Sequence, residues 1–333
     1  MKTATMLSVL LATMLFLPPA LAMDHGLPEV DPLEHADGSI ITAGSSTVFP
    51  LSERMAELWT DEGGVAPSIA SIGSGAGFER FCVEGETDIS NASRAIKDSE
   101  VESCAAIGRQ PIEFRVGSDA LAVTVSAEND FVSDVTLEEL AALFSSAETW
   151  TDVRAEWPPQ TIQRFIPGTD SGTFDYFVEA VFDEDKEPIL SANPQLSEDD
   201  NVLVQGITGS PYAIGFFGYA YYVENADVLN ILKIEGIEAK SETADDGSYP
   251  LARPLYIYSD AGIMAEKPAV NAFINFYLSY VNDEVEDVGY FPASEYAFSG
   301  TIDAWRMANG MTPIGDAALD LMDDRDEEEG MSG

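Results

Sequence analysis

The sequence predicts an α/β fold with parallel strands, because one local pattern occurs three times. In each case a short apolar strand leads into a turn of small and hydroxyl-bearing residues, and a helix with one apolar face follows. The strands are expected at residues 39–44, 67–72 and 161–166, and the turns at 45–50, 73–77 and 167–173. Strands that alternate with helices favour parallel pairing, since a helical crossover returns the chain to the end of the sheet at which the previous strand began.

Length and composition indicate a folded chain of about two domains. The sequence has 333 residues, of which 45% are hydrophobic and 10% aromatic. A chain of this composition can bury a packed core, which a disordered chain cannot.

The net charge of −43 argues against two classes of partner. Nucleic acids and anionic membrane surfaces both attract clustered Lys and Arg, so we expect neither to bind this chain. Such an acidic surface suits strong salt, because the Debye length falls to about 3 Å in molar salt and like charges then repel little. An acidic binding face is the alternative.

The N-terminal segment Met1–Ala22 has the features of an export signal. Lys2 supplies the positive start, Met6–Leu17 is an apolar run too short to span a bilayer, and Ala20-Leu21-Ala22 is a small-x-small cleavage site. No cysteine follows that site, so a lipid anchor is not expected, and no later stretch is apolar enough for membrane insertion. We expect cleavage after about Ala22 and an exported mature protein.

Both ends of the mature chain are expected to lie outside the fold. Residues 23–37 hold two prolines, several acids and both histidines, His25 and His35, and predict a flexible leader. Residues 316–333 are acidic and poor in aromatic side chains, and predict a disordered tail. A Ser-His-Asp hydrolase needs a positioned imidazole, which these histidines do not offer. The sequence has no His/Cys cluster for zinc and no G-x-x-x-x-G-K-[ST] run, so no cofactor is expected.

The chain has two cysteines, Cys82 and Cys104. An even number in an exported protein predicts one disulfide, which would tie down the segment between them. Two buried thiols are the alternative.

The helices after the three turns are predicted from apolar residues that recur on one face. The stripes are Leu51, Met55, Leu58 and Trp59 in the first helix, Phe78, Phe81 and Cys82 in the second, and Phe174, Phe177, Val178, Val181 and Phe182 in the third. Pro50 falls in the first turn of its helix, where it costs no hydrogen bond.

Other elements follow from the same periodicities. A short strand within residues 88–96 ends in polar residues, and further strands are expected at 121–125, within 210–222, at 231–234 and at 255–258. Thr136-Leu137-Glu138-Glu139 is a capping box that starts a helix, and residues 267–281 form another. Residues 202–207 form a helix or a strand.

Helix starts lined with hydroxyl groups can bind an anion, because their first N–H groups lack partners and the helix dipole is positive there. Ser and Thr at these positions are also ordinary helix caps. Arg94 follows a strand among small polar residues, and guanidinium groups bind oxyanions through parallel hydrogen bonds. An ordinary surface arginine is the alternative, but three such helix starts and one arginine can converge on one small anion beyond the strand ends.

These residues resemble the phosphate-binding proteins of bacterial phosphate ABC transporters. The matching stretches are Gly44-Ser45-Ser46-Thr47-Val48-Phe49-Pro50, Gly73-Ser74-Gly75-Ala76-Gly77-Phe78, residues 88–96 and Gly168-Thr169-Asp170-Ser171-Gly172-Thr173-Phe174, with softer matches at residues 213–219 and Arg253-Pro254-Leu255. The motifs occur in the order of the family and cover about residues 38–300.

The resemblance implies a two-lobed periplasmic-binding-protein fold of type II, with mixed sheets flanked by helices and a two-strand hinge. Lobe I would comprise residues 38–117 and 258–315, and lobe II residues 118–257, with crossings near Arg115–Leu121 and Pro254–Asp260. The protein would be a periplasmic monomer that closes over one dehydrated phosphate and passes it to the membrane subunits of an ABC permease. It would not be an enzyme.

The resemblance also implies the contacts to phosphate. Thr47 and the Val48 backbone would bind from the first helix start, with Ser46 adjacent, and Ser74 would bind from the second. Ser171, Gly172 and Thr173 would bind from the third.

Arg94 and Asp170 depart from the better-known members of the family. Those members carry an acidic residue where Arg94 falls and an arginine where Pro167 falls, so the two signs are exchanged between the lobes. A subgroup with Ala-Ser-Arg and Asp-Ser-Gly-Thr resembles this chain more closely. Arg94 would balance the anion, and Asp170 could accept the proton of HPO₄²⁻ and repel sulfate, which has none to offer. Alternatively, Asp170 caps the helix or holds Arg94.

Three other functions stay open from the sequence. The protein could bind another oxyanion such as sulfate or molybdate, or it could be a secreted phosphatase or other hydrolase that works through Asp or Ser. It could also be a phosphate sensor with no permease partner.

If the acidic surface is an adaptation to salt, stability should rise with salt concentration. We expect the melting temperature of the mature protein to be higher in several molar salt than in about 0.1 M salt, because the counterions screen repulsion among the carboxylates. Thermal unfolding followed by circular dichroism measures this. Equal stability under the two conditions would contradict the interpretation.

Overall fold

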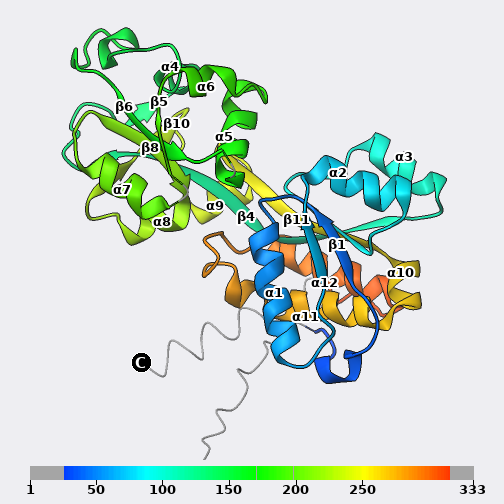
Figure 1. The fold of residues 1–333 in the computed structure, drawn as a ribbon. Helices are drawn as coiled ribbons and strands as arrows, with labels where there is room; N and C mark the ends of the chain where they lie inside the picture. The colour runs from blue at the N-terminus through cyan, green and yellow to red at the C-terminus, as the bar shows by residue number, and fades with distance from the viewer. Residues whose placement is uncertain (1–25, 170, 198, 316–333) are drawn as a thin grey trace, which may run out of the picture.

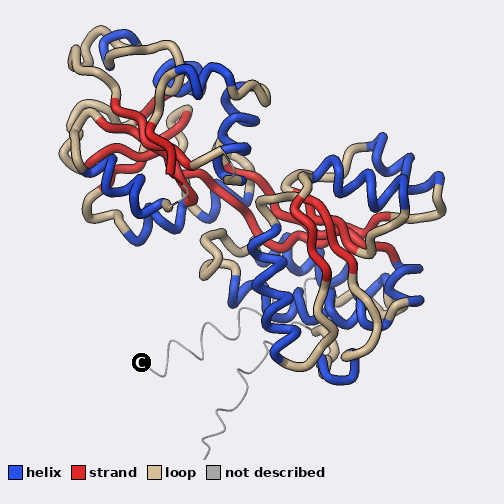
Figure 2. Tube along the Cα trace, in the orientation of Figure 1, coloured by secondary structure: helices blue, strands red, loops and turns tan. Residues whose placement is uncertain are grey.

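In the computed structural model, one mixed sheet runs through the part of the chain that the structure describes, residues 26–169, 171–197 and 199–315. Figure 2 shows this sheet passing through two halves of the molecule, with helices around it in each. The strand order is β2-β1-β3-β11-β4-β8-β6-β7, and β9 pairs with β4 beside this path. The predicted α/β class, with a mixed sheet flanked by helices, is confirmed.

The strands of the sheet are β1 (Ile41–Gly44), β2 (Ser68–Ser71), β3 (Ile89–Ala92), β4 (Pro111–Ser126), β6 (Gln163–Pro167), β7 (Gln195–Ser197), β8 (Ala213–Gly218), β9 (Leu229–Ile231) and β11 (Ala252–Asp260). A separate parallel pair consists of β5 (Asp134–Val135) and β10 (Lys233–Ile234). The strands β1, β2 and β3 pair in parallel, as do β6, β7 and β8, whereas β4 and β11 are antiparallel to their neighbours.

The described α-helices are α1 (Phe49–Asp61), α2 (Ser74–Glu79), α3 (Asp98–Ala106), α4 (Leu137–Leu143), α5 (Gly172–Phe182), α6 (Glu187–Ser191), α7 (Asp200–Thr208), α8 (Tyr219–Glu224), α9 (Ser241–Asp245), α10 (Ala261–Glu266), α11 (Pro268–Glu284) and α12 (Glu295–Ala308). Short helical turns of other types are η1 (Pro32–His35), η2 (Arg80–Glu84) and η3 (Trp150–Asp152).

Two hydrophobic clusters define two lobes. The cluster of lobe I lies around α1, α11 and α12, and the cluster of lobe II includes side chains from α4, α5 and β8. Strand β4 contributes Phe114 and Val116 to lobe I and Leu121 to lobe II. In Figure 1, β4 and β11 run side by side from one half to the other. The two strands therefore connect the lobes.

The chain near β11 also contributes side chains to both clusters. Leu255 and Ile257 of β11 pack in the lobe I cluster, whereas Leu251 packs in lobe II. Arg253 lies between these side chains and pairs in register with Asp119 of β4.

Helix α2 begins at Ser74, inside the stretch expected to form a turn. Gly73 alone takes the left-handed backbone of the turn, with φ +85°. A Cβ on Gly77 would lie 2.5 Å from Gly44 Cα, so α2 packs directly on β1 at that point. The glycines thus bring the second helix start close to the first strand.

The segment 26–37 differs from the expected flexible leader. Leu27 and Val30 pack against the lobe I core, and Asn275 of α11 donates a hydrogen bond to the Pro28 carbonyl at 3.1 Å. The His35 ring stacks on Trp59 with ring centroids 6.1 Å apart. The described part of this segment is therefore bound to lobe I. Residues 1–22, the expected export signal, and residues 316–333, the expected disordered tail, lie outside the described residues.

The predicted disulfide between Cys82 and Cys104 is confirmed. It joins η2 to α3 across a separation of 22 residues, inside a small cluster with Phe78 and Tyr258.

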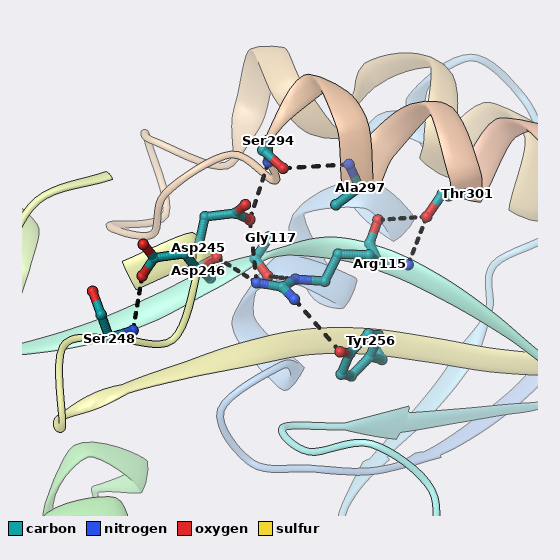
Figure 3. Close-up of polar contacts among 10 residues, drawn as sticks. Arg115, Gly117, Asp245, Asp246, Ser248, Tyr256, Ser294, Ala297 and Thr301 are labelled. Carbon is teal, nitrogen blue, oxygen red and sulfur yellow. Dashed lines mark hydrogen bonds and ion pairs between the residues drawn. The ribbon is translucent and has the colours of Figure 1, made fainter. Parts of the chain in front are cut away.

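A polar network joins the lobes beside the connecting strands (Figure 3). Asp245, at the end of α9 in lobe II, accepts hydrogen bonds from Arg115 Nη2 at 3.3 Å and from the Ser294 N–H at 3.1 Å. Arg115 also donates to Gly117 O at 2.7 Å and to Ser118 Oγ at 2.8 Å. Asp245 therefore links lobe II to β4 and to the first turn of α12 in lobe I.

Removing the charge of Asp245 should destabilise the contact between the lobes. In the Asp245→Asn variant the Ser294 N–H keeps an acceptor, but Arg115 loses its carboxylate, and the two side chains are only 16% and 13% exposed. We expect a loss of about 1 kcal/mol in the free energy of unfolding, measured by urea denaturation.

Asp246→Asn is the matched control, because Asp246 accepts the Ser248 N–H within the turn after α9. If both variants changed stability equally, the contact between the lobes would not be the cause.

Candidate functional site

A cavity of about 320 Å³ lies where the helix starts of the two lobes meet. It is lined by residues 45–47 before α1, residues 73–75 at the start of α2, Ser93, Arg94 and Lys97 between β3 and α3, Gly172, Asp175, Tyr176 and Glu179 on α5, Glu184 after α5, and Arg253 on β11. The three predicted helix starts and Arg94 therefore border one cavity.

The turn before α1 is organised by Ser45, a residue that the sequence analysis placed in a matching motif but not in the site. Its buried Oγ accepts hydrogen bonds from the N–H groups of Thr47 at 3.2 Å and Val48 at 3.4 Å. Ser46 and Thr47 line the cavity, whereas the Val48 side chain is fully buried in the lobe I core. Ser45 thus holds the turn that presents Ser46 and Thr47.

The second helix start is tied to the turn after β3. Ser74 Oγ accepts the Ser93 N–H at 3.1 Å and lies 3.3 Å from Ser93 Oγ. Both serines line the cavity. This pair of contacts fixes the direction in which the chain leaves β3 just before Arg94.

Arg94 reaches the cavity with its charge already paired. Its guanidinium donates to both oxygens of Glu100, at 2.9 and 2.7 Å, and lies over the Phe78 ring at 5.3 Å. The hydrogen bonds to Glu100 raise the pKa of Arg94. Burial alone would raise the pKa of Glu100, but the hydrogen bonds from Arg94 and the Lys97 N–H outweigh it and lower that pKa. The site therefore holds Arg94 in a fixed orientation.

The start of α5 approaches lobe I closely. Ser171 caps the helix by accepting the Thr173 N–H at 3.2 Å. A Cβ on Gly172 would lie 3.6 Å from the Ser46 carbonyl carbon and from Thr47 N. Among the predicted residues of this turn that the structure describes, Gly172 borders the cavity and Ser171 and Thr173 do not. Asp170 lies outside the described residues.

Arg253 also lines the cavity and was not among the predicted site residues. Its Nε donates to Asp119 Oδ2 at 3.2 Å, its Nη2 contacts Gly172 O at 3.5 Å, and its guanidinium lies 3.7 Å from the centroid of the Tyr176 ring. Burial raises the pKa of Tyr176, so the phenol is neutral. The motif Arg253-Pro254-Leu255 was the available signal, but it did not indicate what the arginine contacts.

Glu100 is a further residue that was not among the predicted site residues. It stands at the third position of α3, where a carboxylate commonly caps the helix, and Glu100 does accept the Lys97 N–H at 2.8 Å. The capping position was readable from the sequence, but the pairing with Arg94 depends on the chain path after β3.

The described residues hold no cluster of His, Cys, Asp and Glu suited to a metal ion. None of their helices combines the length and the hydropathy that crossing a membrane requires.

Comparison with known proteins gives a consistent family. The model of the PBP superfamily domain matches residues 30–280. The chain is 38% identical over 284 residues to Protein SphX of Synechococcus elongatus, which covers 81% of this chain and 82% of that protein. It is 36% identical over 269 residues to the phosphate-binding protein PstS of Staphylococcus saprophyticus, and the aligned region covers 78% of this chain and 82% of that protein.

Solved structures share this fold. A possible phosphate binding protein from Planctomyces limnophilus is 35% identical, with a TM-score of 0.76 over 82% of this chain and 99% of that one. A putative phosphate ABC transporter substrate-binding protein from Clostridium perfringens, solved with bound phosphate, is 26% identical, with a TM-score of 0.54 over 77% of this chain and 100% of that one.

The cap by Ser45 can be tested separately from any ligand. Ser45→Ala removes the acceptor of two buried N–H groups, and we expect a loss of about 1 kcal/mol in the free energy of unfolding, measured by urea denaturation. Ser46→Ala is the control, because the described residues offer its hydroxyl no hydrogen bond. A loss that was the same in the two variants would refute the capping role.

Proposed function

Because this chain belongs to the PBP superfamily, and within it to the family of its PstS relatives, we propose that it binds inorganic phosphate and delivers it to an ABC-type permease. The family consists of substrate-binding proteins of phosphate transporters and not of enzymes. The observation that carries the proposal is the cavity bordered by three helix starts and Arg94, since hydroxyl groups, N–H groups and a guanidinium suit a small oxyanion.

In this proposal, phosphate sits between the lobes. Ser46, Thr47 and the Val48 backbone donate from the α1 start, and Ser74 donates from the α2 start. Arg94 balances the negative charge. Ser171, Gly172 and Thr173 bind through the α5 start once the lobes close, and Asp170 accepts the proton of HPO₄²⁻. Support comes from the position of Ser46, Thr47, Ser74, Arg94 and Gly172 around one cavity.

Closure of the lobes would exclude water from the bound anion and strengthen each hydrogen bond. The hinge strands would be β4 and β11, with lobe I formed by the chain before and after them and lobe II by the chain between. The close approach of Gly172 to the turn at Ser46 and Thr47, where an added Cβ would lie 3.6 Å from Thr47 N, supports this arrangement, because the two elements belong to different lobes.

Members of this family are periplasmic or extracellular. We place this chain in the periplasm as a monomer, after removal of residues 1–22. The composition of Met1–Ala22 supports export, and the family membership supports association with membrane subunits of the permease.

Isothermal titration tests the function. We expect the mature protein to bind phosphate at micromolar concentrations or below and to discriminate against sulfate, which has no proton to donate. Arg94→Ala should weaken phosphate binding by at least about tenfold, because a charged hydrogen bond is lost, while the fold stays intact by circular dichroism. No binding of phosphate by the wild-type protein would refute the proposed function.

Two further variants separate the charge of Arg94 from its surroundings. Arg80→Ala is the control for removing an exposed arginine of lobe I and should leave the dissociation constant unchanged. Arg94→Ala also leaves Glu100 unpaired, so the Arg94→Ala/Glu100→Ala double variant removes the remaining carboxylate. If the double variant bound phosphate like the wild type, repulsion by Glu100 rather than loss of a contact to Arg94 would explain the single variant.

A further inference from the structure

Arg253 stands at the point where the connecting strands meet the cavity. It pairs in register with Asp119 of β4, and from this position its guanidinium reaches the first turn of α5. Strands β4 and β11 carry residues of both lobe clusters, so this side chain starts from the hinge and not from either helix layer. Its position is therefore fixed by the backbone pairing of the sheet.

Burial distinguishes Arg253 from the other two cations that line the cavity. Arg253 is only 8% exposed. The Arg94 side chain is 28% exposed, and Lys97 is exposed. Screening by salt acts strongly on exposed charges and weakly on buried ones. High salt should therefore weaken the attraction of Arg94 and Lys97 for an anion more than that of Arg253.

The guanidinium of Arg253 keeps donor capacity for a ligand. It has five N–H hydrogens, and within the described residues its hydrogen bonds are one from Nε to Asp119 and one long contact from Nη2 to Gly172 O. The Tyr176 ring covers one face of the guanidinium, which leaves the in-plane edge as the direction for further hydrogen bonds. Tyr176 and Arg253 both line the cavity.

We infer that Arg253 is a second anion-binding guanidinium of the cavity, held by Asp119 and Tyr176, and that its contribution to phosphate affinity persists in high salt, whereas that of Arg94 declines. The inference rests on the proposed function, because it assigns a residue to the same phosphate site. It fits a chain with a net charge of −43, in which an anion is repelled by the surface and must be held by a cation beyond the reach of counterions.

The test compares dissociation constants for inorganic phosphate, measured by isothermal titration in about 0.1 M and about 1 M salt, where the Debye lengths are about 10 Å and 3 Å. Arg253→Met alone would leave the Asp119 carboxyl buried without a partner and could prevent folding. The informative variant is therefore Arg253→Met/Asp119→Asn. We expect it to bind phosphate at least about tenfold more weakly than the wild type at both salt concentrations.

For Arg94→Ala, the ratio of its dissociation constant to that of the wild type should fall as salt rises. Arg253→Lys should bind with an affinity between those of the wild type and the double variant, because the charge stays but the planar fork over Tyr176 is lost. Arg164→Lys is the matched control. Arg164 is also 8% exposed, but it donates to carbonyl groups inside lobe II, including Leu143 O, and should leave affinity unchanged.

The outcomes separate the two proposals. If the wild type fails to bind phosphate, the proposed function is wrong whatever the variants do. If the wild type binds and Arg253→Met/Asp119→Asn, folded by circular dichroism, binds equally well, Arg253 is not part of the site. If the loss in the double variant disappears in about 1 M salt, as expected for Arg94→Ala, the role of burial is refuted.

Discussion

The antiparallel pairing of β4 with β11 is the constraint on which the rest of the structure depends. These strands carry apolar side chains of both lobe clusters, so their register determines which polar groups meet between the lobes. It sets Asp119 opposite Arg253 at the cavity and Arg115 opposite Tyr256 farther along. The first pair reaches α5, and Arg115 reaches α9 through Asp245. The two polar contacts between the lobes, at Arg253 and at Arg115, therefore both originate from this strand pair.

The arginines that line the cavity are held by ion pairs in a very acidic chain. With a net charge of −43, a binding site for an anion needs cations whose positions are fixed and whose N–H groups stay accessible to the anion. Arg94 is fixed by both oxygens of Glu100, and Arg253 is fixed by Asp119 through a single Nε contact. Each pair neutralises the buried or half-buried charge and fixes the plane of the guanidinium. In the proposed function, an anion would then gain directed hydrogen bonds from the two guanidinium groups, and these are affected less by the acidic surface than long-range attraction is.

How far the sequence could predict the molecule depended on the distance along the chain between interacting residues. Local features were predictable. The structure contains the cap by Ser171 and the capping box at Thr136, which both join residues close in sequence. It also contains the disulfide, which was predictable because the chain has only two cysteines. Helix α12 also had a local signal that the sequence analysis missed, a stripe of Phe298, Ile302 and Trp305 after the cap residue Ser294. For Arg253 the motif Arg253-Pro254-Leu255 was a signal, but its contacts could not be predicted, because its partners Asp119 and Gly172 lie 134 and 81 residues away. The packing of residues 26–37 could not be predicted for the same reason. Their prolines and acids suggest a flexible segment, whereas their contacts are with lobe I residues that are distant in sequence, including Asn275 of α11.

Selectivity follows from which carboxylates remain able to accept a proton from the ligand. A monoprotonated phosphate offers one O–H donor and sulfate offers none, so a site that discriminates needs an acceptor in reach of that hydrogen. Glu100 accepts a hydrogen bond from Arg94 at each of its oxygens, and Asp119 accepts one from Arg253 at Oδ2, so both carboxylates are paired with a cation. The two ion pairs therefore serve the charge of the anion, and recognition of its proton requires a different group. The prediction made for Asp170 gives that role to a carboxylate one residue before the cap of α5, on the lobe opposite Arg94. In that arrangement, Arg94 on one lobe would pair with the charge of the anion, and Asp170 on the other would accept its proton. Only a protonated anion could form both contacts when the lobes close.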